Sequence, residues 1–298
     1  MKSGKLSRRA FLEGGTLFLA GAAAGPVWRC LLDEKPLATI GIVTDIHHAD
    51  KAPNGTRYYR QSLAKLDEAL SALKARKVDR LVHMGDLVDS HPKKEDEEQA
   101  MRTVAERFRK AGLPYHFLLG NHCLEAVDKA RYAELTHSKG GNEAFDVRGV
   151  RFVCLDACFR ADGVPYANKN FVWNDCFVPE SQIAWMEAQI KSAKGPCIVL
   201  THQLLDGLKD VSVKNHEAVR KPIAASGKVT AVLQGHYHQN RLEVIDGVPY
   251  TVLRSIVDGP ELANSGYSVL SVYKDGSAKL EGFREQESRD YVRRGSLV

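Results

Sequence analysis

The first half of the chain shows two hydrophobic patterns, short continuous apolar runs and longer segments with apolar residues at helical spacing. Short apolar runs at residues 37–44, 78–84 and 115–119 predict strands, whereas residues 56–77 and 95–111 carry apolar side chains at helical spacing. The order strand, helix, strand, helix, strand is typical of a parallel sheet with connecting helices.

The second half predicts a mixed pattern of hairpins and helices. Hairpins are expected around Arg148-Gly149, Asp246-Gly247 and Asp275-Gly276, helices at 181–193 and 217–225, and strands at 197–201 and 229–233. Since no linker or repeat interrupts residues 37–285, we expect one domain there and a charged, solvated tail over 286–298. An α/β fold, a four-layer α/β/β/α sandwich of two mixed β-sheets flanked by helices, accounts for this order.

The N-terminal segment, residues 1–30, has the pattern of an export signal and is considered apart from the fold. Ser7-Arg8-Arg9-Ala10-Phe11-Leu12 resembles a twin-arginine export signal, and the apolar run that follows is too short for a permanent membrane span. The resemblance implies the twin-arginine export machinery as a partner and a periplasmic or extracellular location. An uncleaved signal acting as an anchor, or an ordinary basic tail, are the alternatives.

Charge and cysteine content exclude several classes of function. The formal net charge is +5, but residues 1–30 hold five basic residues and one acidic residue, which leaves about +1 for the remainder. We therefore expect no nucleic acid polymer as a partner. The six cysteines form no CxxC pair, and buried free thiols are favoured over a bridge between Cys154 and Cys158.

Polar motifs follow the ends of the predicted strands. In chain order they are Asp45-x-His47, Gly85-Asp86-x-x-Asp89, Gly120-Asn121-His122, a lone His202, and Gly235-His236-x-His238. Open α/β folds build their sites at the carboxyl ends of parallel strands, so we expect these side chains to converge. Carboxylate, imidazole and amide donors suit two divalent ions such as Mn, Fe, Zn or Co, provided that one carboxylate touches both.

This ordered set resembles the calcineurin-like metallophosphoesterase superfamily over about residues 40–273. The resemblance implies that a metal-bridging hydroxide attacks phosphorus, with His122 facing the substrate as proton donor or charge stabiliser and Asp89 orienting His122. The chain departs from the family at Cys123, where an acid is usual, which removes a carboxylate expected near His122. The implied ligands are Asp45, His47 and His238 for one ion, Asn121, His202 and His236 for the other, and Asp86 between them.

A finer resemblance concerns residues 55–63, Gly-Thr-Arg-Tyr-Tyr-Arg-Gln-Ser-Leu. This stretch is similar to manganese-dependent ADP-ribose/CDP-alcohol diphosphatases, although we expect Gln in place of His47 in some of those enzymes. It implies that the small phosphorylated substrate is a phosphodiester or a nucleotide-like diphosphate. Arg57, Tyr58, Tyr59 and Arg60 would bind it, or would serve packing and surface charge. A phosphomonoesterase and a non-catalytic metal-binding module remain alternatives.

Overall fold

The structure, a computed structural model, describes residues 35–292. The predicted export signal, residues 1–30, lies outside this range. Within it, two six-stranded sheets and a two-stranded sheet are connected by helices.

The first sheet joins the parallel strands of the N-terminal half to an antiparallel C-terminal segment. Its order is β14-β13-β12-β1-β2-β3, in which β1, β2 and β3 are parallel and β12, β13 and β14 are antiparallel to their neighbours. The bounds are β1 (Ala38–Val43), β2 (Arg80–His83), β3 (Tyr115–Phe117), β12 (Gly266–Val272), β13 (Ala278–Arg284) and β14 (Arg289–Tyr291).

The second sheet has the order β10-β11-β9-β8-β5-β4. Its four central strands are parallel, and an antiparallel hairpin partner closes each edge. The bounds are β4 (Glu143–Val147), β5 (Val150–Leu155), β8 (Cys197–Thr201), β9 (Val229–Gln234), β10 (Arg241–Ile245) and β11 (Val248–Val252). The three hairpins predicted from sequence are present here and in the first sheet.

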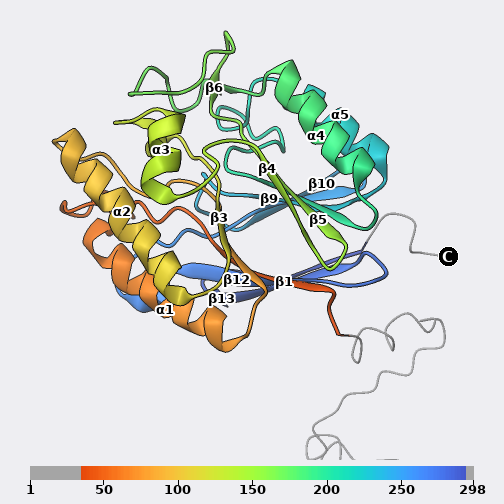
Figure 1. Cartoon of the computed structure of the whole chain (residues 1–298), viewed down its shortest axis with the longest axis horizontal. Coiled ribbons are helices and arrows are strands. Elements are labelled where there is room, and N and C mark those ends of the chain that lie inside the picture. The colour runs from red at the N-terminus through yellow and green to blue at the C-terminus, as the bar shows by residue number, and fades with distance from the viewer. Residues whose placement is uncertain (1–34, 293–298) are drawn as a thin grey trace, which may run out of the picture. The chain divides into compact units, whose positions relative to one another are not determined.

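Apolar layers lie between the two sheets and on the outer face of each sheet. Alternate side chains of both sheets, such as Ile42, Phe152 and Ile198, are fully buried against one another between the sheets. The outer faces are covered by α1 (Ser62–Ala75) and α2 (Lys94–Ala111) on the first sheet, and by α4 (Glu180–Ser192) and α5 (His216–Ser226) on the second (Figure 1). The predicted four-layer α/β/β/α architecture is confirmed.

Local differences from the predicted elements have physical causes. The helix expected from residue 56 begins later, with the 3₁₀ turn Tyr59–Gln61, because the Tyr58 N–H donates to Val257 O across the fold at 3.0 Å. The sequence prediction missed α3 (Lys129–Thr136), although the Asp128 carboxylate accepts from the Arg131 N–H at 2.7 Å as a helix N-cap. Strands β6 (Phe159–Arg160) and β7 (Cys176–Phe177) are too short to show a period.

Part of the expected solvated tail is instead a strand. Arg289–Tyr291 forms β14 on the edge of the first sheet, and Tyr291 is buried, with its hydroxyl donating to Thr251 Oγ1 at 2.9 Å. Tyr291, the single aromatic residue of this charged segment, anchors the segment to the sheet. The many charged residues around it led to the prediction of a solvated tail.

Two absences are established for residues 35–292. Cys154 and Cys158 are both buried and are not bridged to each other, as the sequence analysis favoured. Among the same residues, no helix is both long enough and apolar enough to cross a bilayer.

Candidate metal centre

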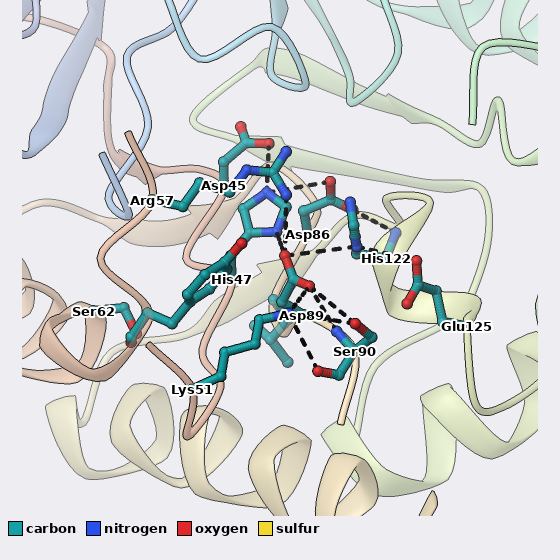
Figure 2. Close-up of polar contacts among 12 residues, drawn as sticks. Asp45, His47, Lys51, Arg57, Ser62, Asp86, Asp89, Ser90, His122 and Glu125 are labelled. Carbon is teal, nitrogen blue, oxygen red and sulfur yellow. Dashed lines mark hydrogen bonds and ion pairs between the residues drawn. The ribbon is translucent and has the colours of Figure 1, made fainter. Parts of the chain in front are cut away.

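The predicted motifs converge where the parallel strands of both sheets end. Asp45 follows β1, Asp86 follows β2, and the turns are tied together because the Asp45 N–H donates to Gly85 O at 3.0 Å. Across the two sheets, the backbone N–H of His236, which follows β9, donates to the Asp45 carboxylate at 3.1 Å. Asp45, His47, Asp86 and His122 face one another in this region (Figure 2).

The backbone at these strand ends is unusual. Five of the seven expected ligands have left-handed φ angles between 45° and 68°, a region that non-glycine residues rarely occupy. Such conformations cost about 1–3 kcal/mol each and persist only where the surrounding fold determines them. The five are Asp45, His47, Asp86, His236 and His238. The fold therefore holds these side chains in place at an energetic cost.

The first cluster is formed by Asp45, His47 and His238, the grouping that the resemblance implied. His238 Nε2 lies 3.1 Å from His47 Nε2 and 3.3 Å from Asp45 Oδ1, and all three side chains are buried. Two imidazole nitrogens and a carboxylate oxygen at these distances form a suitable donor set for a divalent transition metal.

The second cluster contains Asp86, His202 and His236, with Asn121 nearby. His202 Nε2 lies 3.2 Å from Asp86 Oδ2. Asn121 Oδ1, His202 Nε2 and His236 Nε2 are buried without a hydrogen-bond partner among residues 35–292. Buried polar atoms without a partner are costly, and a cation bound among them would satisfy all three. The side chains present therefore fit a metal ion.

Asp86 touches both clusters. Its Oδ2 atom lies 3.5 Å from His47 Nε2 and 3.2 Å from His202 Nε2, while its Oδ1 atom accepts from the His122 N–H at 2.8 Å. This is the placement expected of a ligand shared by two ions.

Three of the imidazoles are fixed through their other nitrogen. The Nδ1 atoms of His202, His47 and His238 lie 2.9, 3.0 and 3.2 Å from Met84 O, Asp89 Oδ2 and Asp258 Oδ2, respectively. These contacts orient the rings and leave Nε2 available to a cation. The sequence analysis missed Asp258, because a single Asp after β11 matches no motif.

Electrostatics also favour a cation. Burial would raise the pKa of Asp86, but His202 and His122 hold it well below its ordinary value. Burial opposes a charge on His238, yet Asp45 and Asp258 raise its pKa to about 9. Because a metal binds neutral imidazole, loading would release this proton, and affinity would increase with pH.

The Asp89 carboxylate lies closer to His47 than to His122. Its Oδ2 atom is hydrogen-bonded to His47, whereas His122 Nδ1 lies 3.8 Å away and is closer to Glu125 Oε1, at 3.2 Å (Figure 2). The Cys123 side chain is fully buried, with its sulfur accepting from the Leu87 N–H at 3.4 Å. Cys123 therefore supplies no acid to His122, and Glu125, two positions later, brings a carboxylate beside the imidazole instead.

A cavity of about 410 Å³ opens beside the two clusters, lined in part by Asp86, His122, His236 and His238. Of the four expected substrate-binding residues, Arg57 lines this cavity, and Tyr58, Tyr59 and Arg60 do not. Tyr59 is buried in a small apolar cluster, and Arg60 forms an exposed ion pair with Asp50. The turn at the start of α1 directs neighbouring side chains to different faces, so Arg57 alone of these four lies beside the two clusters. Arg254 and Trp173, which the sequence did not indicate as ligand-binding, also line the cavity.

Glu97 on α2 links the two loops that carry the site. Its carboxylate accepts from the N–H groups of His91 and Ala126 at 3.3 and 3.1 Å. Burial, with a smaller contribution from nearby Glu125, raises the pKa of Glu97 to about 7. Ionisation is thus disfavoured in the folded protein, so the native state loses stability as pH rises from 4.5 to 7.

Glu97→Gln is expected to remove that pH dependence. The free energy of unfolding of the variant minus that of the parent should be larger at pH 8 than at pH 4.5, by on the order of 2 kcal/mol. Urea unfolding at the two pH values measures the change, and Glu95→Gln at the exposed start of the same helix is the control. If the free energies of unfolding of variant and parent differed by the same amount at both pH values, the raised pKa of Glu97 would be contradicted.

Comparisons with known proteins agree with this geometry. The family model of calcineurin-like phosphoesterases matches residues 38–240, more than half of the chain. A manganese-dependent ADP-ribose/CDP-alcohol diphosphatase of Arabidopsis thaliana is 24% identical over 305 residues, covering 86% of this chain and 97% of the relative. The diphosphatase of the same description from Xenopus laevis is 33% identical over 98 residues, covering 30% of this chain and 28% of the relative.

Solved structures share the fold. A dimetal phosphatase from Danio rerio superposes with a TM-score of 0.77 at 19% identity, covering 87% of this chain and all of that one. A purple acid phosphatase from yellow lupin superposes with a TM-score of 0.54 at 15% identity, covering 85% of this chain and 53% of that one. At these identities the likeness concerns the architecture alone.

Proposed function

The chain belongs to the calcineurin-like phosphoesterase family, and from this premise we propose that it hydrolyses the phosphoanhydride bond of a nucleotide-like diphosphate. Membership makes it a metal-dependent phosphoester hydrolase. When bound, divalent ions would neutralise phosphoryl oxygens and activate water. Asp45, His47 and His238 would hold one ion, Asn121, His202 and His236 the other, and Asp86 both.

The observation that carries the proposal is a pair of arginines in the cavity beside these ligands. Arg57 Nη1 donates to Asp89 Oδ2 at 3.0 Å, and Arg254 Nη1 donates to His238 O at 3.1 Å, so both guanidinium groups are fixed. A diphosphate has a second anionic group that needs a partner away from the metal ligands, and guanidinium suits phosphate. A monoester has no such second group.

An exposed aromatic side chain in the cavity lining, that of Trp173, favours a nucleotide substrate over a diphosphate that has no base. The Trp173 side chain is half exposed and lies 5.6 Å, centroid to centroid, from the His236 ring. Its loop is held in place, because Tyr166 and Phe171 stack at 4.0 Å and the Asn170 side chain bonds to the backbone at Ala167 and Pro165. An exposed ring on a fixed loop beside a phosphate-binding cavity is suited to stacking on a base.

The diphosphatase relatives support the same substrate class. They are manganese-dependent, which favours manganese among the ions that the donor set accepts. We also propose export through the twin-arginine route, on the strength of Arg8-Arg9 and the apolar run after them. Replacing both arginines with lysine should retain a tagged protein in the cytoplasm.

Hydrolysis by the metal-stripped full chain, resupplied with Mn, Fe, Zn, Co or Mg, tests the function. The substrates are ADP-ribose, a CDP-alcohol, bis-p-nitrophenyl phosphate and p-nitrophenyl phosphate. Metal-dependent release of a nucleoside monophosphate is the expected result. Preference for p-nitrophenyl phosphate would indicate a phosphomonoesterase. Metal binding without turnover of any substrate would favour the non-catalytic module.

Trp173→Ala is expected to raise KM for ADP-ribose about tenfold or more, because base–aromatic stacking contributes about 1–3 kcal/mol. The hydrolysis of bis-p-nitrophenyl phosphate should change less, since this substrate has no nucleobase. Val164→Ala, at another exposed apolar position of the same loop and outside the cavity lining, is the control. Equal loss for both substrates would refute a base-stacking role.

A further inference from the structure

We infer that Glu125 orients His122 toward the substrate in this chain, in the role that the family resemblance implied for Asp89. The inference rests on the proposed function, since it concerns how one residue of that site is held. It makes Glu125 a positioning residue, which acts on the reaction only through the imidazole of His122.

Asp89 has no capacity left for His122. Its Oδ2 atom accepts from His47 Nδ1 and Arg57 Nη1, each at 3.0 Å, and its Oδ1 atom accepts from Lys51 Nζ at 2.5 Å and the Ser90 N–H at 2.8 Å. Ser90 Oγ also donates to Oδ1, at 3.3 Å, so five donors occupy the carboxylate, as Figure 2 shows in part. The 3.8 Å separation from His122 Nδ1 is beyond hydrogen-bond length.

Glu125 is placed by the short helical turn that begins at His122. The 3₁₀ turn spans His122–Leu124, and Glu125 follows it with helical dihedrals, so its side chain projects from the same face as that of His122, three residues earlier. The Glu125 Oε1 atom lies 3.2 Å from His122 Nδ1, an ion-pair distance without hydrogen-bond geometry, and no other group among residues 35–292 hydrogen-bonds to this Nδ1. The Glu125 carboxylate is mostly buried. Cys123 lies on the opposite face of this turn, in the core.

The contact determines which ring nitrogen faces the cavity. With Nδ1 directed to Glu125, Nε2 is the nitrogen available on the cavity side, where His122 contributes to the lining. The ring is also held edge-on against His47, with centroids 4.7 Å apart and planes at 75°. Without the Glu125 acceptor, rotation about the Cβ–Cγ bond would exchange the two nitrogens.

Two substitutions distinguish the orienting effect of Glu125 on His122 from the space that the Glu125 side chain fills. Glu125→Met keeps the length of the side chain but removes the acceptor, and should lower kcat about 10- to 100-fold with KM nearly unchanged, as is typical when an outer partner of a catalytic or ligand histidine is lost. Glu125→Gln keeps an acceptor oxygen and should retain most of kcat. Glu134→Met, on an exposed glutamate of α3, should leave kcat unchanged.

A second readout does not depend on turnover. Long-range ¹H–¹⁵N spectra of the Mg²⁺-supplemented protein, with His122 assigned through His122→Gln, should show a proton on Nδ1 in the parent and in Glu125→Gln but not in Glu125→Met. If no substrate is hydrolysed, the proposed function fails while these spectra still test the contact. Wild-type kcat in Glu125→Met, equal loss in the Met and Gln variants, or an unaltered Nδ1 signal in Glu125→Met would each overturn the inference.

Discussion

Asp86→Asn should abolish turnover while leaving the protein folded. Asparagine has nearly the same shape, and its Oδ1 atom can still accept from the His122 N–H, but the charge shared between the two clusters is lost. We expect kcat/KM to fall about 10³-fold or more, equivalent to about 4 kcal/mol of transition-state stabilisation. Steady-state kinetics across a range of metal concentrations measures the loss, and circular dichroism checks the fold.

The control for Asp86→Asn is Asp156→Asn. Asp156 is also a buried carboxylate that follows a strand, but its partners are Lys129 at 2.5 Å and the Cys158 N–H at 2.9 Å. It lies outside both clusters, so turnover should persist even if stability falls. A residual rate in Asp86→Asn close to that of the parent would mean that the measured hydrolysis arises elsewhere.

Gly85→Ala should cost about 3 kcal/mol or more of unfolding free energy and weaken metal binding. Gly85 has φ of +106°, which L-residues rarely adopt, and an added Cβ would lie 2.3 Å from His202 Nδ1. Either His202 moves away from Met84 O, or the turn that positions Asp86 shifts. Urea unfolding and calorimetric metal titration measure the two effects.

Gly163→Ala separates strain from steric clash. Gly163 also has a left-handed φ, +81°, but an added Cβ would have no atom within 4 Å. We expect a loss of about 1 kcal/mol from strain alone and unchanged metal affinity. Similar losses at the two glycines would show that contact with His202 is unimportant.

The residues of the candidate centre could be predicted because each lies at a strand end. A buried apolar run followed by Asp, Asn or His is a local pattern, and sheet geometry brings such ends together without further information. The same reasoning predicted the sheets and most helices. It failed for Tyr291, because the pairing of a charged segment with β13 is decided by tertiary contacts.

The supporting residues could not be found in this way. Asp258 contacts His238, 20 positions away, and Arg57 contacts Asp89, 32 positions away, and neither contact follows from a periodic pattern. Glu125 is different, because its separation of three residues from His122 predicts contact if the segment is helical. The Gly120-Asn121-His122 motif predicted an acid at position 123, whereas the local turn directs the side chain at position 125 to the imidazole of His122.

The ligands of the first cluster come from different halves of the molecule, since His47 and His238 meet across 191 positions of sequence and follow strands of different sheets, β1 and β9. A bound ion would act as a reversible cross-link between the halves, and only the native state would hold it. At a free concentration one hundred times Kd, this adds about 2.7 kcal/mol to stability. In a metal-poor environment the protein would open more often to proteases, so its cellular lifetime should follow the supply of its metal.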